Sequence, residues 1–364
     1  MSTVSSSKKN NSFVLQKQDE ISFEDRPVPV AGPGQVIVNI KATGICGSDV
    51  HYWTHGRIGH FVCKGPMVLG HESAGIVASL GEGVTDLEVG DRVALEPGVP
   101  CGRCEMCKIG KYNLCPDMAF AATPPYDGTL CDFYRHSADF CYKLPKNVSL
   151  EEGALIEPLS VGIHAARRGE VRLGDRVFVF GAGPVGLLTA AAAKAAGAAH
   201  VTMADISESR LKFAKSYIAD ETIHMTSKPP KDVDTNEFAK AEAEKIFASG
   251  ISPANVVFDC TGVEVCVQMS IYLVKNNGKI VLVGMGASVQ SISVADVSAR
   301  EVDVRGVMRY CNTYPTAIEM LASGKIDLKS LITHRYKFKE SLEAFQHVKE
   351  GREGTIKIVI TNDD

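Results

Sequence analysis

The chain has 364 residues, of which 45% are hydrophobic and 23% are charged, and its formal net charge is −4. This composition is typical of a soluble globular protein long enough for two domains. The small negative charge argues against nucleic acid or an anionic membrane as a partner. No apolar stretch is long enough to span a membrane, and the N-terminus lacks the apolar core of a signal peptide. The 11 cysteines fit a reducing compartment, so we expect a cytoplasmic protein.

The N-terminal part of the chain reads as a tail followed by short strands. Residues 1–12 are rich in Ser, Lys and Asn, and we expect a disordered tail there. Strands are predicted at 36–41, 73–79 and 91–97, with Gly and Pro between them. Many short strands separated by glycine-rich turns are typical of a β-barrel-like domain.

Four closely spaced cysteines follow these strands, at Cys101, Cys104, Cys107 and Cys115. Two-residue gaps allow a short loop to wrap its thiolates around one metal ion. Four thiolates complete the tetrahedral shell of Zn²⁺, so we predict a closed, structural zinc site in a lobe at about residues 97–118. An iron–sulfur cluster and a disulfide knot are the alternatives, although the bacterial cluster motif has a shorter last gap.

A second group of metal ligands lies in the same N-terminal region. Cys46, His71 and Glu72 supply a thiol, an imidazole and a carboxylate, all of which bind Zn²⁺. Three protein ligands leave a fourth position open for a substrate. This group is therefore a candidate catalytic metal site.

After about residue 165 the pattern changes to alternating strands and helices. The run at 176–180 is apolar throughout, as in a strand buried on both faces, and an alanine-rich helix is predicted at 185–196. Further strands are predicted at 200–204, 255–259 and 279–283. This alternation predicts an α/β, doubly wound, parallel-sheet domain.

A glycine-rich turn joins the first strand and helix of this domain. In Gly181-Ala-Gly183-Pro-Val-Gly186 the glycines permit a tight turn, close backbone approach to a pyrophosphate and close helix packing. Asp205 ends the next strand, where a carboxylate binds the adenosine ribose and repels a 2′-phosphate. The sequence therefore favours NAD over NADP, although Arg210 is near enough in sequence to meet a phosphate.

These motifs together resemble the zinc-dependent medium-chain dehydrogenases. The resemblance rests on Gly70-His71-Glu72, the four cysteines, Glu157-Pro-Leu-Ser-Val161 and the glycine-rich turn. The stretches at 44–53, 65–72, 122–125 and 309–312 narrow it to the polyol branch, with its sorbitol, xylitol and L-arabinitol dehydrogenases. It covers roughly residues 13–360. Some sorbitol dehydrogenases lack the four-cysteine lobe, whereas this chain keeps all four cysteines.

The resemblance implies a GroES-like β-barrel catalytic domain at 13–165, a Rossmann NAD-binding domain at 166–300 and a C-terminal segment, 301–364, that returns to the catalytic domain. It further implies a homotetramer with NAD and two Zn²⁺ ions per chain. Catalytic zinc is assigned to Cys46, His71 and Glu72. Glu157 would lie beside the metal, and Ser48 or a water held by Glu157 would carry the proton away.

The same resemblance assigns further residues to the binding of the substrate and of NAD. The residues expected to line the substrate pocket are Tyr52, Phe120, Thr123, Glu157, Arg309 and Tyr310. The residues expected to contact NAD are Gly181, Gly183, Val185, Gly186, Asp205, Arg210, Val283, Gly284, Met285, Val307, Met308 and Arg309.

The implied activity is oxidation of the C2 hydroxyl of a sugar alcohol to a ketose, with reduction of NAD⁺ to NADH. An L-arabinitol 4-dehydrogenase is one alternative, and a threonine-type or simple secondary-alcohol dehydrogenase is another. Glu157 and Arg309-Tyr310 argue against the latter, because a polar site suits a polyhydroxylated substrate. A non-catalytic structural protein and a zinc-ribbon nucleic-acid binder are the rivals from other classes.

Overall fold

The computed structural model describes residues 9–362, and the chain divides into two compact units. The first unit combines Met1–Glu157 with Tyr314–Asp364, and the second is Pro158–Thr313. Residues 9–12, which the sequence assigned to a disordered tail, instead begin strand β1 (Lys9–Lys17). Residues 1–8 lie outside the described part. Among the described residues, no helix has the length and apolar character to cross a membrane.

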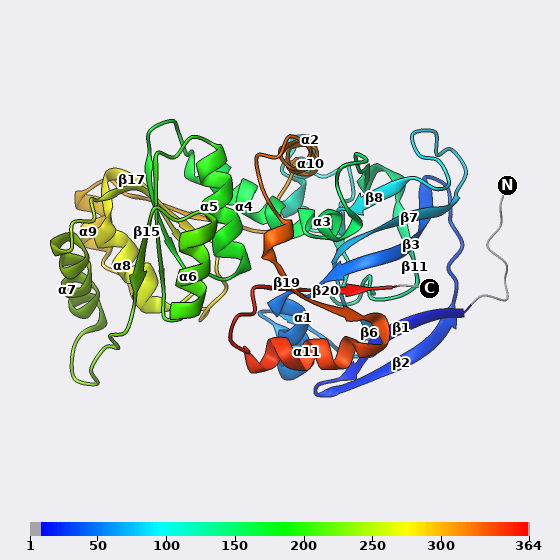
Figure 1. The fold of residues 1–364 in the computed structure, drawn as a ribbon, viewed down its shortest axis with the longest axis horizontal. Coiled ribbons are helices and arrows are strands. Elements are labelled where there is room, and N and C mark those ends of the chain that lie inside the picture. Colours follow the sequence, from blue (N-terminus) through cyan, green and yellow to red (C-terminus); the bar gives the residue numbers. More distant parts are fainter. Residues whose placement is uncertain (1–8, 363–364) are drawn as a thin grey trace. The chain divides into compact units, whose positions relative to one another are not determined.

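The first unit is built on a seven-stranded sheet, shown in Figure 1. Its path runs through β12 (Cys141–Lys143), β8 (Arg92–Leu95), β7 (Glu72–Leu80), β3 (Gln35–Gly44), β20 (Lys357–Thr361) and β19 (Ile332–Lys337). Strand β11 (Phe133–Ser137) also pairs with β3. The predicted strands at 36–41, 73–79 and 91–97 are thus confirmed as β3, β7 and β8. Val36, Ile37 and Val38 are all buried, so both faces of β3 are covered at this point, because successive side chains of a strand point to opposite faces.

Smaller elements complete the first unit. A second sheet has the order β2 (Glu20–Pro27), β1, β6 (Met67–Val68). Two short two-stranded sheets pair β4 (Arg57–Ile58) with β5 (Phe61–Val62) and β9 (Gly98–Val99) with β10 (Ala119–Phe120). The helices are α1 (Gly47–His55), α2 (Glu105–Lys108), α3 (Leu150–Ala154), α10 (Tyr314–Ala322) and α11 (Ser341–Glu350). Phe13, Trp53, Leu69 and Phe345 share one hydrophobic core, so segments from both ends of the chain stabilise this unit.

The second unit is a six-stranded parallel sheet covered by helices on both faces. Its strand order is β15 (Glu221–His224), β14 (His200–Asp205), β13 (Arg176–Phe180), β16 (Ala254–Asp259), β17 (Val274–Leu282), β18 (Asp303–Gly306). In Figure 1, helices α5 (Pro184–Ala195) and α6 (Glu208–Tyr217) lie on one face, and α7 (Thr235–Ala248), α8 (Glu264–Leu273) and α9 (Val294–Ala299) lie on the other. Helix α4 (Ile156–Gly169) precedes the sheet. In chain order the strands run 3-2-1-4-5-6, so the order reverses between β13 and β16, where dinucleotides bind in such sheets.

Candidate functional site

Cys46, His71 and Glu72 come together at one end of the first unit's sheet. Cys46 is the residue before α1, and His71 and Glu72 stand at the start of β7. One ligand atom from each lies within 4.8 Å of the other two, an arrangement that could hold a metal ion. His71 and Glu72 are buried, and Cys46 is partly exposed.

Asp49, on the first turn of α1, contacts His71 and the backbone at Gly70 and Cys46, and so fixes the relative positions of His71 and Cys46. Its carboxylate is 1% exposed, and Oδ1 accepts a 3.0 Å hydrogen bond from the backbone N–H of Gly70. The same oxygen lies 3.3 Å from Nδ1 of His71, and Oδ2 lies 3.4 Å from the backbone nitrogen of Cys46. A carboxylate on one ring nitrogen fixes the orientation of an imidazole and leaves the other nitrogen for a metal.

Glu72 is held by a lysine from the far end of the chain. Nζ of Lys357 donates a 2.6 Å hydrogen bond to Glu72 Oε1 and also contacts Oε2. A buried carboxylate beside a thiol and an imidazole fits the donor set of Zn²⁺.

The cluster has a strongly anionic environment. Burial lowers the pKa of His71, but the charge of Asp49 and the Cys46 sulfur outweigh burial and raise that pKa well above its ordinary value. Burial likewise lowers the pKa of Lys357, and attraction to Glu72, Cys46 and Glu157 reverses the effect, so its pKa is raised. The field that favours these positive charges also favours a metal cation.

The four cysteines of the lobe also converge. Sγ of Cys107 lies 3.4 Å from Sγ of Cys104 and 4.0 Å from Sγ of Cys101, and all four sulfurs are within 4.8 Å of one another. A tetrahedral ion with Zn–S bonds of about 2.3 Å places its sulfurs about 3.8 Å apart. The backbone N–H groups of Arg103 and Cys104 lower the pKa of Cys101 to about 6, which favours the thiolate that binds metal.

The sulfur–sulfur distances distinguish among the three alternatives for the lobe, which are a zinc site, an iron–sulfur cluster and a disulfide knot. All 11 cysteines lie in the described part of the chain, and each is free, so the disulfide-knot alternative is wrong here. Sulfurs that close suit one ion rather than the several irons of a cluster. The arrangement therefore fits a single zinc.

Glu96 attaches the lobe to the sheet. Its carboxylate is 1% exposed and accepts hydrogen bonds from the hydroxyls of Tyr112 in the lobe, at 2.7 Å, and Tyr142 on β12, at 2.9 Å. Burial raises the pKa of Glu96 to about 7, although both hydroxyls oppose this shift. Its backbone oxygen pairs with His136 on β11 at 2.8 Å.

The glycine-rich turn of the second unit has the geometry that a pyrophosphate needs. Gly181 has φ +95°, and a Cβ at Gly186 would lie 1.9 Å from the Gly181 carbonyl oxygen. Helix α5 begins at Pro184, so its free N–H groups point out of the turn. Asp205 ends β14, and its oxygens accept hydrogen bonds from Ala182 N at 2.6 Å and Ser207 N at 2.8 Å. The residues present therefore fit a dinucleotide.

Arg210 lies closer to this turn than its place in the sequence implied. Its Nη1 is 3.9 Å from the position of a Cβ on Gly183. Val283 and Gly284 follow β17 and donate to the Asp259 carbonyl oxygen at the end of β16, near the reversal of strand order. Of the other residues expected at NAD, Met285 and Met308 are 70% and 41% exposed.

The residues predicted to line the substrate pocket lie in both units. In the first unit, the ring of Phe120 is 5.9 Å from that of His71. Glu157 is 5% exposed at the start of α4, Tyr52 and Thr123 are buried, and Ser48 is half-buried on α1. In the second unit, Arg309 has φ +50° and Tyr310 is buried.

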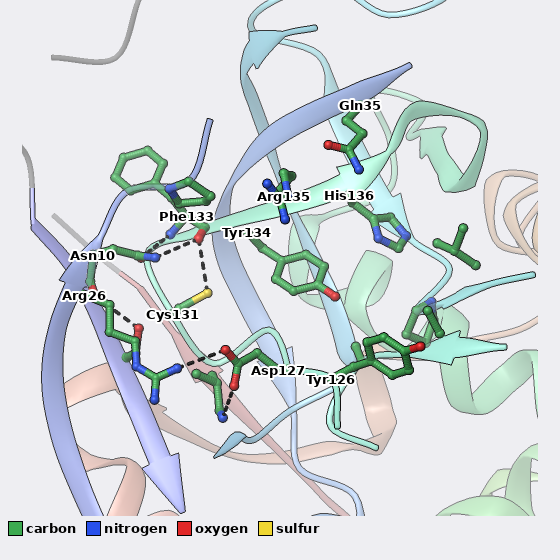
Figure 2. A pocket seen from close by; sticks show the side chains of 18 of the residues that line it. Asn10, Arg26, Gln35, Tyr126, Asp127, Cys131, Phe133, Tyr134, Arg135 and His136 are labelled. Atoms are coloured by element: carbon green, nitrogen blue, oxygen red, sulfur yellow. Dashed lines mark hydrogen bonds and ion pairs between the residues drawn. The ribbon is translucent and has the colours of Figure 1, made fainter. Parts of the chain in front are cut away.

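A cavity of about 600 Å³ lies beside this region of the first unit, and Phe120 lines it. Figure 2 shows its charged and polar rim: Arg26 pairs with Asp127 at 2.9 Å, and Asn10 bonds the backbone of Phe133.

The motifs did not identify three residues that shape these sites. Asp49 lies within the stretch 44–53 that supports the family resemblance, and its place three residues after Cys46 is a helix-capping position. Lys357 interrupts an apolar strand, and this was the only signal in the sequence. Glu96 precedes a proline and gave no comparable signal.

Comparison with known proteins bears on the whole chain. Residues 32–146 match the alcohol dehydrogenase GroES-like domain, and residues 184–323 match the zinc-binding dehydrogenase family. Sorbitol dehydrogenase of Gallus gallus is 50% identical over 97% of this chain and 97% of its own. Sorbitol dehydrogenase of Mus musculus is 52% identical over 94% and 93%.

A solved structure agrees with these sequence matches. An Escherichia coli oxidoreductase of unknown specificity involved in membrane biogenesis has a TM-score of 0.90 at 36% identity, over 98% of this chain and 100% of its own. The GroES-like and Rossmann fold, the oxidoreductase class and the use of zinc and a nicotinamide cofactor are thereby confirmed. The chain belongs to the sorbitol dehydrogenase branch of the zinc-dependent medium-chain dehydrogenases, and it is a polyol dehydrogenase.

Proposed function

We propose that this enzyme oxidises the C2 hydroxyl of a sugar alcohol to a ketose and passes the hydride to NAD⁺. The convergence of Cys46, His71 and Glu72, whose ligand atoms all lie within 4.8 Å of one another, is the observation that carries this proposal. Zinc held by these three side chains supplies Lewis acidity to the substrate hydroxyl. NAD⁺ supplies the hydride acceptor. The alcohol thus loses one hydride and one proton, and the products are ketose, NADH and H⁺.

The remaining roles follow from position. Glu157 is a buried carboxylate whose charge acts on Lys357, and it is assigned the role of holding a water or a substrate hydroxyl. Ser48 follows Cys46 by two residues and receives the hydroxyl proton on its way to solvent. Substrate contacts are assigned to Tyr52, Phe120, Thr123, Glu157, Arg309 and Tyr310. NAD contacts are assigned to Gly181, Gly183, Val185, Gly186, Asp205, Arg210, Val283, Gly284, Met285, Val307, Met308 and Arg309.

Preference for NAD⁺ is assigned to Asp205. An ionised carboxylate there accepts a hydrogen bond from the ribose and repels a 2′-phosphate, so wild type should favour NAD⁺ in kcat/KM by at least about tenfold, or 1.4 kcal/mol. Ile206 is 80% exposed, so an arginine there can reach a phosphate. Asp205→Ala with Ile206→Arg should shift the preference toward NADP⁺.

The control for this experiment is Arg210→Ala, because Arg210 lies beside the turn. If wild type used both cofactors equally and Arg210→Ala selectively lost NADP⁺ activity, Arg210 would be the determinant and the role given to Asp205 would be wrong.

The preferred polyol is decided by initial rates with sorbitol, xylitol and L-arabinitol, with threonine and 2-butanol as controls. We expect the polyols to exceed both controls in kcat/KM. Identification of the ketose by chromatography separates oxidation at C2 from oxidation at C4. Higher rates with threonine or 2-butanol would refute the polyol assignment.

We further propose a cytoplasmic homotetramer, as the family resemblance implies. Light scattering behind size-exclusion chromatography should give four times the chain mass of 39.1 kDa. A monomer or dimer at micromolar concentration would contradict this.

A further inference from the structure

Lys357 reaches the candidate metal site by crossing a neighbouring strand. In the sheet, β3 lies between β7 and β20. Gly44 on β3 is paired with Glu72 on one side and with Val359 on the other. Lys357 precedes Val359 by two residues and therefore points to the same face of the sheet.

The Lys357 side chain can pass over β3 because Gly44 has no side chain. A Cβ there would lie 2.1 Å from Oε2 of Glu72 and 3.1 Å from Cε of Lys357. Its φ lies outside the range that disfavours other residues, so space, rather than backbone conformation, requires this glycine. The gap allows the lysine and the glutamate to meet above β3.

The ammonium group joins the two segments that supply the metal ligands. Nζ of Lys357 donates to Glu72 Oε1 at 2.6 Å and to the carbonyl oxygen of Ile45 at 2.9 Å. Ile45 precedes Cys46 directly. One buried cation, 4% exposed, therefore fixes the Glu72 carboxylate relative to the backbone that carries Cys46.

Stability alone does not explain a lysine here. Taking an ammonium and a carboxylate out of water costs several kcal/mol per ion before their attraction is counted, and apolar residues are often as stabilising at such positions. The rest of β20 is mainly Ile and Val. A functional reason for the charge is therefore worth seeking.

The charges around the site supply that reason. Cys46, Asp49, Glu72 and Glu157 bring one thiol and three carboxyl groups to this region, and Lys357 places an ammonium group against Glu72. A cation at this position limits the negative charge that a bound metal would have to offset.

We propose that Lys357 is a positioning residue for the reaction: it fixes the orientation of the Glu72 carboxylate beside Cys46 and His71, and its charge maintains the electrophilic character of the site. This role rests on the ligand set proposed above. It is separate from the ligand set itself, because Lys357 binds no metal.

The test compares Lys357→Met, which keeps volume and removes charge, with Lys357→Arg, which keeps charge. Lys339→Met is the matched control, because Lys339 is exposed. Zinc content, the rate of zinc transfer to a chromogenic chelator, and kcat and KM for the best polyol are measured for each protein. The visible spectrum of cobalt-substituted protein reports the coordination of the catalytic site.

In Lys357→Met, a freed and uncompensated Glu72 should bind the metal more tightly. We expect both zincs to be retained, slower zinc transfer than in wild type, a changed cobalt spectrum and a kcat lowered by about tenfold or more, with KM little changed. Lys357→Arg should recover zinc transfer and part of kcat, and Lys339→Met should match wild type.

Two results would overturn the proposal. Faster zinc loss together with lower activity in Lys357→Met would mean that Lys357 only stabilises the site. An unchanged kcat in Lys357→Met would mean that Lys357 has no role in the reaction. If wild type itself held no zinc that the chelator can remove, the ligand assignment would fail, and the role of Lys357 with it.

Discussion

His71 is the residue on which the candidate metal site can be tested most directly. Replacing it with alanine removes one of three ligands, so turnover should fall below detection, while NAD⁺ binding should stay within about twofold, because the dinucleotide turn belongs to the other unit. Calorimetry with NAD⁺ measures cofactor binding, and initial rates measure turnover. His60→Ala, at an exposed histidine, is the control. Turnover near the wild-type rate would rule out a metal at this position.

At the scale of single residues, sequence motifs and the chemical type of the side chains predicted the candidate ligands. Contacts between residues far apart in the sequence could not be predicted in this way. Cys46, His71 and Glu72 could be proposed because a thiol, an imidazole and a carboxylate of known zinc affinity stand in short glycine-flanked motifs. Lys357 lies 285 residues from Glu72 in sequence, and no local pattern connects them. Arg210, by contrast, was expected from the sequence to lie near the dinucleotide, and its Nη1 lies beside the glycine-rich turn.

Among the elements, the cysteine lobe should depend on its metal. Cys104→Ser removes one of four thiolates, and loss of a structural metal is among the largest single-residue effects, roughly 4 kcal/mol or more of unfolding free energy. Cys63→Ser, at a cysteine outside both clusters, should change stability little. Denaturant unfolding with zinc analysis checks both. Equal stability of the two variants would mean that the lobe folds without zinc.

The attachment of the lobe to the sheet should depend on pH through Glu96. Its pKa in the folded protein, about 7, is raised above 4.5, so the protonated carboxyl is favoured by folding. This stabilising contribution is present below about pH 4.5 and is lost as the pH rises through about 7, to a maximum of about 3 kcal/mol.

Glu96→Gln keeps the hydrogen-bonding shape without the titration. Its unfolding free energy should therefore lack the part of the wild-type decline between about pH 4.5 and pH 7 that belongs to Glu96, whereas Glu82→Gln, at an exposed carboxylate, should follow wild type. Parallel wild-type and Glu96→Gln curves would show that Glu96 is ionised in both states.

Element prediction succeeded where periodicity is strong. The apolar run at 176–180 and the helix after the glycine-rich turn are β13 and α5, because a buried parallel strand and an alanine-rich helix have distinct patterns. Strand β1 begins within a polar stretch, where composition favoured a tail. This segment forms a strand because its backbone pairs with β2, and the polar sequence of the segment alone does not indicate that pairing.

At the scale of the whole molecule, the two metal clusters should behave differently. We expect two zincs per chain. The lobe has four thiolates, whereas the Cys46 cluster has mixed ligands and an open position, so mild chelation should remove only the latter zinc. Metal analysis before and after chelation checks this, with activity lost and then restored by added zinc. A single zinc per chain, or iron, would contradict the expectation.

The overall architecture was predictable largely through family resemblance. Alternating strands and helices indicate a doubly wound sheet from physical pattern alone, whereas the return of the last segment to the first unit was implied only by the resemblance. The units divide at Glu157 and Tyr314, whereas the sequence placed the boundaries near 165 and 300. Composition changes gradually there, and helix α4 crosses the first boundary.

The position of β20 has a consequence for synthesis of the protein on the ribosome. The chain emerges from its N-terminus, so Cys46, His71 and Glu72 leave the exit tunnel long before Lys357, and all of the second unit is made in between. At about 5–20 residues per second, tens of seconds separate Glu72 from its counter-ion. During that interval the nascent sheet lacks β20, and the Glu72 carboxylate has no lysine beside it. Because of this order of translation, we expect the candidate metal site to be completed late, after the chain of the second unit has been made.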